Sequence, residues 1–279
     1  MVKRYEADVD LLNLLKEKAR LIRMGIIEAL GIGNRGHLGG SMSCADIVAA
    51  LYFCKMRHSP ENRNDPNRDR FIMSKGHSVL AQYAALAEAG YFEKSALSST
   101  KSLGSILQGH PERSTPGVEA NTGSLGQGLS IGVGMALAGK ADSRDYHVYV
   151  ITGDGELAEG QIWEAAMAAS NYNLDNLTVI VDMNGIQAMG NTRDRFRIQN
   201  ISGRFATFGW KTFEIDGHDM ESILEALDAT NTVRGCPSAI IARTIKGKGV
   251  NFAENKHTYH NNLLTAEDRV NAIASVNSM

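Results

Sequence analysis

Residues 148–189, VYVITGDGELAEGQIWEAAMAASNYNLDNLTVIVDMNGIQAM, contain the pattern from which the fold is inferred. An apolar, β-branched run ends at Gly153-Asp154-Gly155, and a helical segment follows it. A second apolar run, residues 177–181, ends at Asp182-Met183-Asn184. This is the pattern of a β-strand, a crossover helix and a second, parallel strand.

Polar side chains stand at the ends of both strands. Parallel strands place their carboxyl ends at one edge of the sheet, which is where open α/β sheets bind ligands. We therefore expect Asp154 and Asn184 to meet there and to hold one hard cation through oxygen atoms, the ligands that Mg²⁺ prefers. A cation with so few protein ligands usually keeps phosphate oxygens as well, so the sequence predicts a diphosphate site. A Gly-Asp-Gly tripeptide is also a common turn, but its position between a strand and a helix favours the ligand site.

The length and the order of elements favour one domain. A chain of 279 residues is compatible with one large domain or two small ones. Strands and helices alternate, and no linker rich in proline and serine divides the chain. We therefore expect a single α/β domain over residues 1–279, with three layers, a mostly parallel sheet and an N-terminal helical segment.

Composition and charge exclude several classes of partner. The formal net charge is −2, with 43% hydrophobic and 22% charged residues, as is typical of a soluble globular protein. The basic residues are dispersed, so neither nucleic acid nor an anionic membrane is an expected partner. No apolar run approaches the length of a membrane span, and the N-terminal sequence MVKRYEADVD becomes acidic where a secretory signal would become apolar. We expect a cytoplasmic protein.

The three cysteines, Cys44, Cys54 and Cys236, are odd in number and show no close CxxC spacing. This argues against a disulfide framework and against a zinc ribbon. We expect all three side chains to be buried as small hydrophobic groups.

Apolar periodicity predicts the remaining elements. In residues 10–30 apolar side chains recur at steps of four and three, which predicts an amphipathic helix. GIGNRG at 31–36 matches a dinucleotide-binding fingerprint, but it follows a helix rather than a strand, so a nicotinamide site is not expected. Further expected elements are helices at 43–53, 78–89, 129–141 and 220–230, strands at 71–73, 210–215 and 238–244, loops at 58–70 and 190–202, and a flexible basic loop at 245–250.

Three histidines lie in Gly-His loops, each at the end of an expected element: His37, His77 and His110. One loop histidine is more often structural than catalytic, but three such loops indicate a cluster on one face. A zinc site is the alternative, and the wide spacing of these three argues against it. His257 and His260 do have a spacing that zinc ligands use, so a metal site there stays open.

A glycine-rich turn at 121–128 precedes the helix expected at 129–141. Small residues let a backbone or a ligand approach closely, and the amides at a helix N-terminus suit an anion or a polar heterocycle. Tight helix packing alone would also account for the glycines.

Seven motifs in this order resemble the N-terminal, diphosphate-binding half of transketolase, an enzyme family that uses thiamine diphosphate. The motifs are RGHLGG (35–40), SKGH (74–77), QGHPE (108–112), TGSLGQG (122–128), GDGELAEGQ (153–161), TIKGKGV (244–250) and HTYH (257–260). They span nearly the whole chain. The resemblance implies the thiamine-diphosphate-binding fold and transfer of a two-carbon ketol unit from a ketose to an aldose, as in pentose phosphate metabolism.

The resemblance also implies how the cofactor is held. Mg²⁺, Ca²⁺ or Mn²⁺ would bind Asp154, Asn184 and the backbone carbonyl of Ile186, and would bridge the cofactor diphosphate. The other cofactor-binding residues that it implies are His77 and Gly155 at the diphosphate, Gly123 and Leu125 at the two rings, and Ile245 as an apolar wall.

The catalytic residues implied by the resemblance are His37, His110, His260 and Glu159. The histidines would face the substrate and exchange protons with its hydroxyls, and Glu159 would help to couple two cofactors across a dimer. Histidines suit ketol cleavage, which needs a base for a hydroxyl and donors for a developing oxyanion. The carbanion chemistry itself belongs to the cofactor.

The sequence departs from the family in two places. His260 is followed by Asn261, where the family usually has glycine, so the loop after it is expected to differ. Full-length members also carry a second domain, which binds the aminopyrimidine ring and supplies its activating glutamate and arginines for the substrate phosphate. We therefore expect one half of a split transketolase, active as an α₂β₂ heterotetramer with a separate C-terminal subunit on sugar phosphates or related sugars.

Three alternatives remain. The α subunit of a 2-oxoacid dehydrogenase is also a split thiamine diphosphate protein with a GDG motif, although RGHLGG, SKGH and QGHPE fit the sugar-transferring enzymes better. A deoxyxylulose-phosphate synthase is disfavoured because those chains are not usually split. A regulatory subunit that binds the cofactor without turnover is the alternative from a different class.

Overall fold

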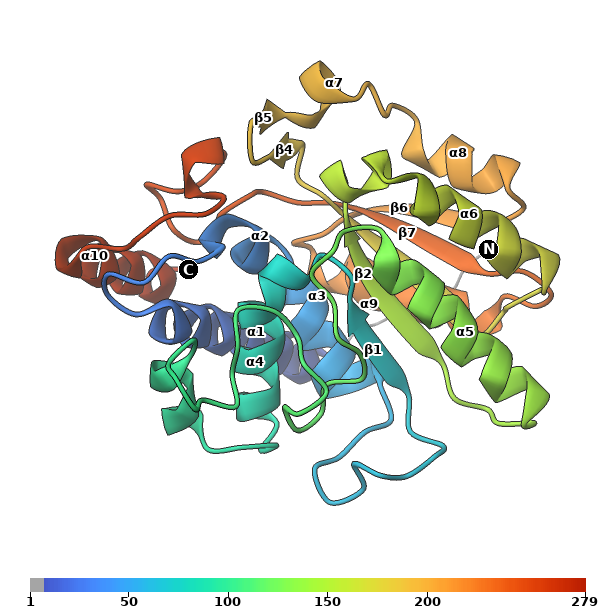
Figure 1. Ribbon diagram of the computed structural model, residues 1–279, viewed down its shortest axis with the longest axis horizontal. Coiled ribbons are helices and arrows are strands. Elements are labelled where there is room, and N and C mark those ends of the chain that lie inside the picture. The colour runs from blue at the N-terminus through green and yellow to red at the C-terminus, as the bar shows by residue number, and fades with distance from the viewer. Residues whose placement is uncertain (1–7) are drawn as a thin grey trace.

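A five-stranded sheet forms the centre of the fold in the computed structural model, which describes residues 8–279 (Figure 1). The expectation about a secretory signal rests partly on residues 1–7, which lie outside the described part. The strand order is β1-β2-β3-β7-β6, and every pairing in this sheet is parallel, as expected. Its strands are β1 (Arg70–Met73), β2 (Val148–Gly153), β3 (Leu177–Met183), β7 (Ser238–Arg243) and β6 (Lys211–Asp216).

Helices cover both faces of the sheet, which is why the central strands are apolar on both sides. Along β2, Tyr149 and Ile151 belong to one hydrophobic core, while Val148 and Val150 belong to the other, as the two-residue period of a strand requires. The fold is thus the expected three-layer α/β/α arrangement.

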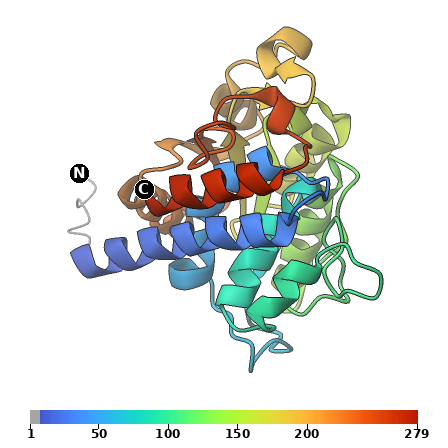
Figure 2. The same ribbon diagram turned by 90° about the vertical axis from the view of Figure 1, so that its left-hand side faces the viewer.

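The first core is covered by α1 (Val9–Leu30), α2 (Leu38–Ser43), α3 (Ala45–Ala50), α4 (Val79–Glu88), α9 (Met220–Thr232) and α10 (Ala266–Asn277). The second core is covered by α5 (Gln127–Ala141), α6 (Gly160–Asn171) and α8 (Ile201–Thr207). A small hairpin, β4 (Ile186–Gln187) and β5 (Gly190–Asn191), leads into the short helix α7 (Thr192–Arg195). Single helical turns occupy Leu51–Lys55, Gly76–Ser78, Lys94–Ser99, Gly155–Ala158 and His257–Tyr259. Figure 2 shows α10 lying along α1.

The helix expected at 43–53 corresponds to α3 and the turn Leu51–Lys55, but a separate helix before it, α2, which begins at Leu38, is absent from the expected elements. Glycine has a low helix propensity, yet Gly39 and Gly40 lie inside α2. Close packing overrides propensity here: a Cβ on Gly39 would lie 3.0 Å from Lys246 Cγ, and one on Gly40 would lie 2.7 Å from Ser78 Oγ.

The expected loop at 190–202 is also partly wrong, since it contains β5, α7 and the start of α8. Helix α10 is absent from the expected elements, although its sequence carries a start signal. Thr265 and Asp268 form a reciprocal capping box at its N-terminus.

The cysteine expectation holds for one residue only. Cys44 is buried, but Cys54 is exposed and Cys236 is intermediate. Cys54 lies in the turn Leu51–Lys55, where only Leu51 and Tyr52 are buried. None of the helices within residues 8–279 combines the length and the hydropathy that crossing a membrane requires.

Candidate functional site

The loops after β2 and β3 meet at the carboxyl edge of the sheet. Asp154 follows β2, and Asn184 follows the neighbouring strand β3. Oδ1 of Asp154 accepts a hydrogen bond from the Gly155 amide at 2.8 Å, and Oδ2 accepts one from the Gly185 amide at 2.6 Å. The carboxylate after β2 is thereby tied to the residue that follows Asn184.

The oxygen atoms at this edge fit a hard divalent cation. Asp154 is only 5% exposed, and no cationic side chain of residues 8–279 forms an ion pair with it. Burial, followed by the nearby negative charge of Asp182, raises its pKa to about 6. A buried carboxylate without a cation is costly. The Asn184 amide oxygen and the Ile186 carbonyl supply further oxygen ligands of the kind that Mg²⁺ prefers.

Asp182, which is fully buried, organises the floor of the site. Its carboxylate accepts hydrogen bonds from Ser43 Oγ (2.5 Å), Lys75 Nζ (2.5 Å), Asn184 Nδ2 (3.2 Å) and the Thr244 hydroxyl. The Lys75 ammonium holds the pKa of Asp182 below its usual value against the opposing effect of burial. The Asn184 amide nitrogen donates to Asp182, and its oxygen accepts a hydrogen bond from the Ile186 amide at 3.1 Å. That oxygen has a second lone pair, which can act as a ligand.

A second buried lysine, Lys246, reaches the site from the loop after β7. Its Nζ lies 3.0 Å from the Ile186 carbonyl oxygen and 3.1 Å from His260 Nδ1. Unlike Lys75, it forms no ion pair with a carboxylate in the described part of the chain, and burial lowers its pKa to about 8. The Ile186 carbonyl has two lone pairs, so one stays available beside Lys246.

Three histidine rings converge next to these residues. The ring centroids lie 4.8 Å apart for His37 and His77, 5.0 Å for His77 and His260, and 5.3 Å for His37 and His260. Burial lowers the pKa of His37 to about 4, of His77 to about 2 and of His260 to about 3. All three imidazoles are therefore neutral near pH 7, and a neutral imidazole can accept a proton as a general base.

The buried carboxylate of Glu156 fixes the glycine-rich turn against the end of β2. It accepts hydrogen bonds from Ser74 Oγ (2.6 Å), the Gly126 amide (2.9 Å) and the Gly153 amide (3.0 Å). This contact places the N-terminus of α5 beside the metal-binding candidates.

A cavity of about 400 Å³ joins most of these groups. Its lining includes seven of the expected residues, namely His77, Leu125, Asp154, Gly155, Asn184, Ile186 and His260. The ring of His37 adjoins the cavity through its contacts with His77 and His260.

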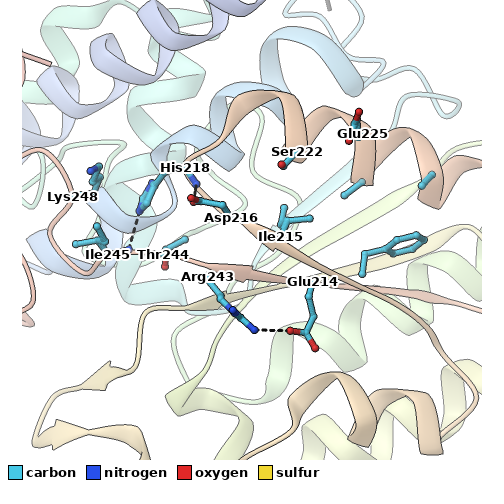
Figure 3. A pocket seen from close by; sticks show the side chains of 13 residues that line it. Glu214, Ile215, Asp216, His218, Ser222, Glu225, Arg243, Thr244, Ile245 and Lys248 are labelled. Atoms are coloured by element: carbon cyan, nitrogen blue, oxygen red, sulfur yellow. Dashed lines mark hydrogen bonds and ion pairs between the residues drawn. The ribbon is translucent and has the colours of Figure 1, made fainter. Parts of the chain in front are cut away.

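Four other expected residues do not line this cavity. His110 is exposed and packs against Gly123, where a Cβ would lie 3.0 Å from the His110 ring. Glu159 is exposed beside Gly126 at the start of α6. Ile245 lies instead on a different depression, which is formed by β6, α9 and the loop after β7 (Figure 3). Their roles stay predictions.

Sequence reasoning missed Lys75, Lys246 and the central position of Asp182. The loop at 245–250 is predicted to be flexible, but Lys246 is 2% exposed. A signal for Lys75 and Lys246 exists, because each lysine lies inside a motif that also carries an expected site residue.

The alternative metal site at 257–260 gains no support from the geometry. His257 is exposed, while His260 faces the cavity. Within residues 8–279, no group of three histidine, cysteine, aspartate or glutamate side chains is arranged to hold a metal ion.

Comparison with known proteins identifies related chains. The family model described as "Transketolase, thiamine diphosphate binding domain" matches residues 14–276. An apulose-4-phosphate transketolase subunit of Phocaeicola vulgatus is 41% identical over 268 residues, covering 96% of this chain and 94% of the relative. The 6-deoxy-6-sulfo-D-fructose transketolase subunit SqwG of a Clostridium species is 43% identical over 263 residues, covering 94% and 96%.

Solved transketolases share the fold. The Campylobacter jejuni enzyme superposes with a TM-score of 0.89 at 34% identity, covering 95% of this chain and 43% of that chain. This chain therefore spans less than half of the solved enzyme and nearly all of the two subunits named above.

Proposed function

This chain belongs to the transketolase family, and from that membership we propose that residues 1–279 act as one diphosphate-binding domain, the N-terminal subunit of a split transketolase. The proposed reaction moves a two-carbon ketol unit from a ketose to an aldose. Relatives of nearly the same span are named transketolase subunits, which supports a division of the enzyme between two chains.

The observation that carries this proposal is the buried, unpaired carboxylate of Asp154 beside two further oxygen ligands in a cavity lined by neutral histidines. In the proposal, Asp154, Asn184 and the Ile186 carbonyl hold Mg²⁺ or a similar cation, which binds the cofactor diphosphate. His77 and Gly155 lie along the same cavity and are proposed to contact the diphosphate.

The bound cofactor supplies the electron sink for carbon–carbon cleavage. The neutral rings of His37 and His260 are proposed to accept and return the protons of substrate hydroxyls. Lys246 Nζ lies 3.1 Å from His260 Nδ1. When Lys246 donates to Nδ1, the His260 proton is on Nε2, so that this nitrogen is a donor toward the cavity. His110 and Glu159, which are exposed, are proposed to act where a partner chain completes the site.

A separate C-terminal subunit is the proposed partner. It would bind the aminopyrimidine ring and contribute the activating carboxylate, in an α₂β₂ assembly. The sugar is expected to be a phosphate or a related anionic ketose, since the relatives are named for apulose 4-phosphate and a sulfonated fructose.

The test combines binding and turnover. Calorimetry with thiamine diphosphate and Mg²⁺ should show binding to the chain alone, and Asp154→Ala should abolish it. Asp145→Ala is the matched control, because Asp145 is an exposed carboxylate that pairs with Arg57 before the start of β2. Ketol transfer from apulose 4-phosphate, 6-deoxy-6-sulfofructose or xylulose 5-phosphate should appear only after addition of a separate C-terminal transketolase subunit.

Three results would overturn parts of this proposal. Full turnover by the chain alone refutes the split enzyme. Oxidative decarboxylation of pyruvate by the reconstituted complex, without ketol transfer, identifies a 2-oxoacid dehydrogenase subunit. Metal-dependent cofactor binding without turnover in any complex identifies a regulatory subunit.

A further inference from the structure

The side chain of His218, in the loop after β6, joins two segments that are far apart in the sequence. Its Nε2 accepts a hydrogen bond from the Ile245 amide at 2.8 Å (Figure 3). Its Nδ1 lies 2.7 Å from Asp46 Oδ2. An amide can only donate, so Nε2 carries no proton. The proton is therefore on Nδ1, which donates to Asp46.

Asp46 is itself held in place from α1. Arg23, which is 1% exposed, donates to both carboxylate oxygens of Asp46, through Nη1 at 3.0 Å and Nη2 at 2.6 Å. A two-bond contact between a planar guanidinium and a carboxylate fixes the orientation of both groups. The His218 ring is thus attached to a rigid, buried ion pair between α1 and α3.

Arg23 and the backbone of α2 hold the far end of the loop after β7. Arg23 Nε donates to the Lys248 carbonyl at 3.2 Å, and the Gly247 amide donates to the Gly39 carbonyl at 2.9 Å. Residues 245–248 are therefore fixed at both ends, by His218 at Ile245 and by Arg23 at Lys248.

Lys246 lies between these two attachments and extends in the other direction, into the cofactor cavity. Its ammonium touches the Ile186 carbonyl and His260. A buried lysine without a carboxylate partner would leave the cavity if its backbone were free to move, because its charge is better solvated by water. The loop must therefore be held for Lys246 to stay in place.

We propose that Arg23, Asp46 and His218 form a positioning relay that holds the loop 245–248 and thereby keeps Lys246 against Ile186 and His260. None of these three residues lines the cavity, so they are positioning residues. The expected effect on cofactor affinity rests on the proposed function, whereas the effect on the loop does not.

Two substitutions of His218 separate its two hydrogen bonds. In His218→Asn the amide nitrogen takes the place of Nδ1, so the bond to Asp46 is kept and the acceptor for Ile245 is lost. In His218→Gln the longer side chain brings an oxygen to the place of Nε2, so the acceptor is kept. If His218 only stabilised the Asp46 ion pair, His218→Asn would disturb the protein less than His218→Gln. If His218 holds the loop 245–248, His218→Asn should loosen that loop more than His218→Gln does.

The first measurement is hydrogen exchange of peptides that cover 244–252, which needs no cofactor. His218→Asn should raise the exchange rate of these amides by about tenfold, the effect of removing one buried hydrogen bond. His218→Gln should stay close to the wild type. Unchanged protection of this loop in His218→Asn, with the fold confirmed by circular dichroism, would overturn the proposal.

The second measurement is a double-mutant cycle on the dissociation constant of thiamine diphosphate with Mg²⁺. His218→Asn and Lys246→Met should each weaken binding by about tenfold, and the double variant should be no weaker than Lys246→Met alone. Additive losses would show that His218 does not act through Lys246. If the wild type fails to bind the cofactor, the proposed function fails, while the exchange experiment still decides the relay.

Discussion

Asp154 and Asp182 lie at the carboxyl ends of the neighbouring strands β2 and β3, but their surroundings shift their pKa values in opposite directions. Asp182 is surrounded by Lys75 and two hydroxyls, and its pKa is lowered. Asp154 receives only backbone amides, and its pKa is raised to about 6. Neighbouring carboxylates whose pKa values are driven apart commonly have different tasks. Asp182 accepts hydrogen bonds from four side chains of the site, and Asp154 is the carboxylate that we propose to bind a cation.

Lys246→Met is expected to stabilise the cofactor-free protein. Burial lowers the Lys246 pKa from 10.5 to about 8, and replacing a buried charge with an apolar side chain of similar shape is often stabilising. Because the variant also loses two hydrogen bonds, we expect a net gain of about 1–2 kcal/mol at pH 7. Urea denaturation measures it.

The matched control is Lys16→Met, an exposed lysine on α1, which should change stability by less than about 0.5 kcal/mol. A Lys246→Met protein that is less stable than the wild type would contradict this prediction. It would show that the buried ammonium stabilises the cofactor-free fold.

His147 should make the protein sensitive to acid. Burial lowers its pKa from 6.5 to about 4, so between these values the unfolded chain binds a proton that the folded protein does not. Stability from this group is fully present above pH 6.5 and is lost as the pH falls toward 4, by up to about 3 kcal/mol. The measurement is urea denaturation of wild type and His147→Gln at pH 7, 6 and 5.

Because other histidines titrate in the same range, the informative quantity is the difference between the two proteins. That difference should shrink as the pH falls. His147 lies before β2 and forms a hydrogen bond with Thr178, away from the cavity, so a constant difference would mean that its pKa is not lowered in the folded state.

The sequence predicts those residues of the candidate site whose position is set by the strand immediately before them. Asp154 and Asn184 follow apolar strands, and parallel strands bring their ends together. Lys75 and Lys246 could not be predicted as buried, because lysine is rarely buried and its burial here depends on contacts with Asp182 and Ile186. Such contacts join residues far apart in the chain.

At the scale of elements, apolar runs were sufficient to predict the strands of the five-stranded sheet. The glycines at 39 and 40, by contrast, argue against a helix where the structure has one. Helix α2 contains Gly39 and Gly40, which intrinsic propensity places outside a helix. The central strands β2, β3 and β7 needed only local sequence, because burial on both faces leaves continuous apolar runs. The start of α2 depends instead on the space that Lys246 and Ser78 occupy against it.

Two glycines in α5 should respond in opposite ways to alanine. A Cβ on Gly128 would lie 2.6 Å from the Ser74 backbone, so Gly128→Ala should push α5 away from the end of β1 and destabilise the protein by about 1–3 kcal/mol. Gly134 is exposed and has nothing within 4 Å of that position. Gly134→Ala should stabilise by about 0.5–1 kcal/mol, through helix propensity alone.

Thermal denaturation of Gly128→Ala, Gly134→Ala and the wild type measures the two stability changes within one helix. Because Glu156 holds the Gly126 amide next to Gly128, Gly128→Ala should also weaken cofactor binding, whereas Gly134→Ala should not. Equal stability changes in both variants would contradict the close approach of α5 to Ser74.

At the scale of the whole molecule, we propose that the carboxyl edge of the sheet is one part of a larger site. The cavity is lined by residues of the loops after β1, β2, β3 and β7, which we propose to bind one cation and one anionic ligand. His110 and Glu159, by contrast, are exposed and do not line this cavity. The cofactor is thus expected to bind by its diphosphate end and to require another chain around its other ring.

Cation and cofactor should therefore stabilise the chain together more than either does alone. At a ligand concentration of 100 times the dissociation constant, binding adds about 2.7 kcal/mol to the free energy of unfolding, or about 5 °C in Tm for a chain of this size. Mg²⁺ alone should give a smaller rise by pairing with Asp154, and thiamine diphosphate in EDTA should give almost none. Scanning calorimetry of the chain under these conditions, with Asp154→Ala as the unresponsive variant and Asp145→Ala as the responsive control, makes the comparison. A full shift with thiamine diphosphate in EDTA would mean that the diphosphate is held by Lys75, Lys246 and backbone amides without a metal.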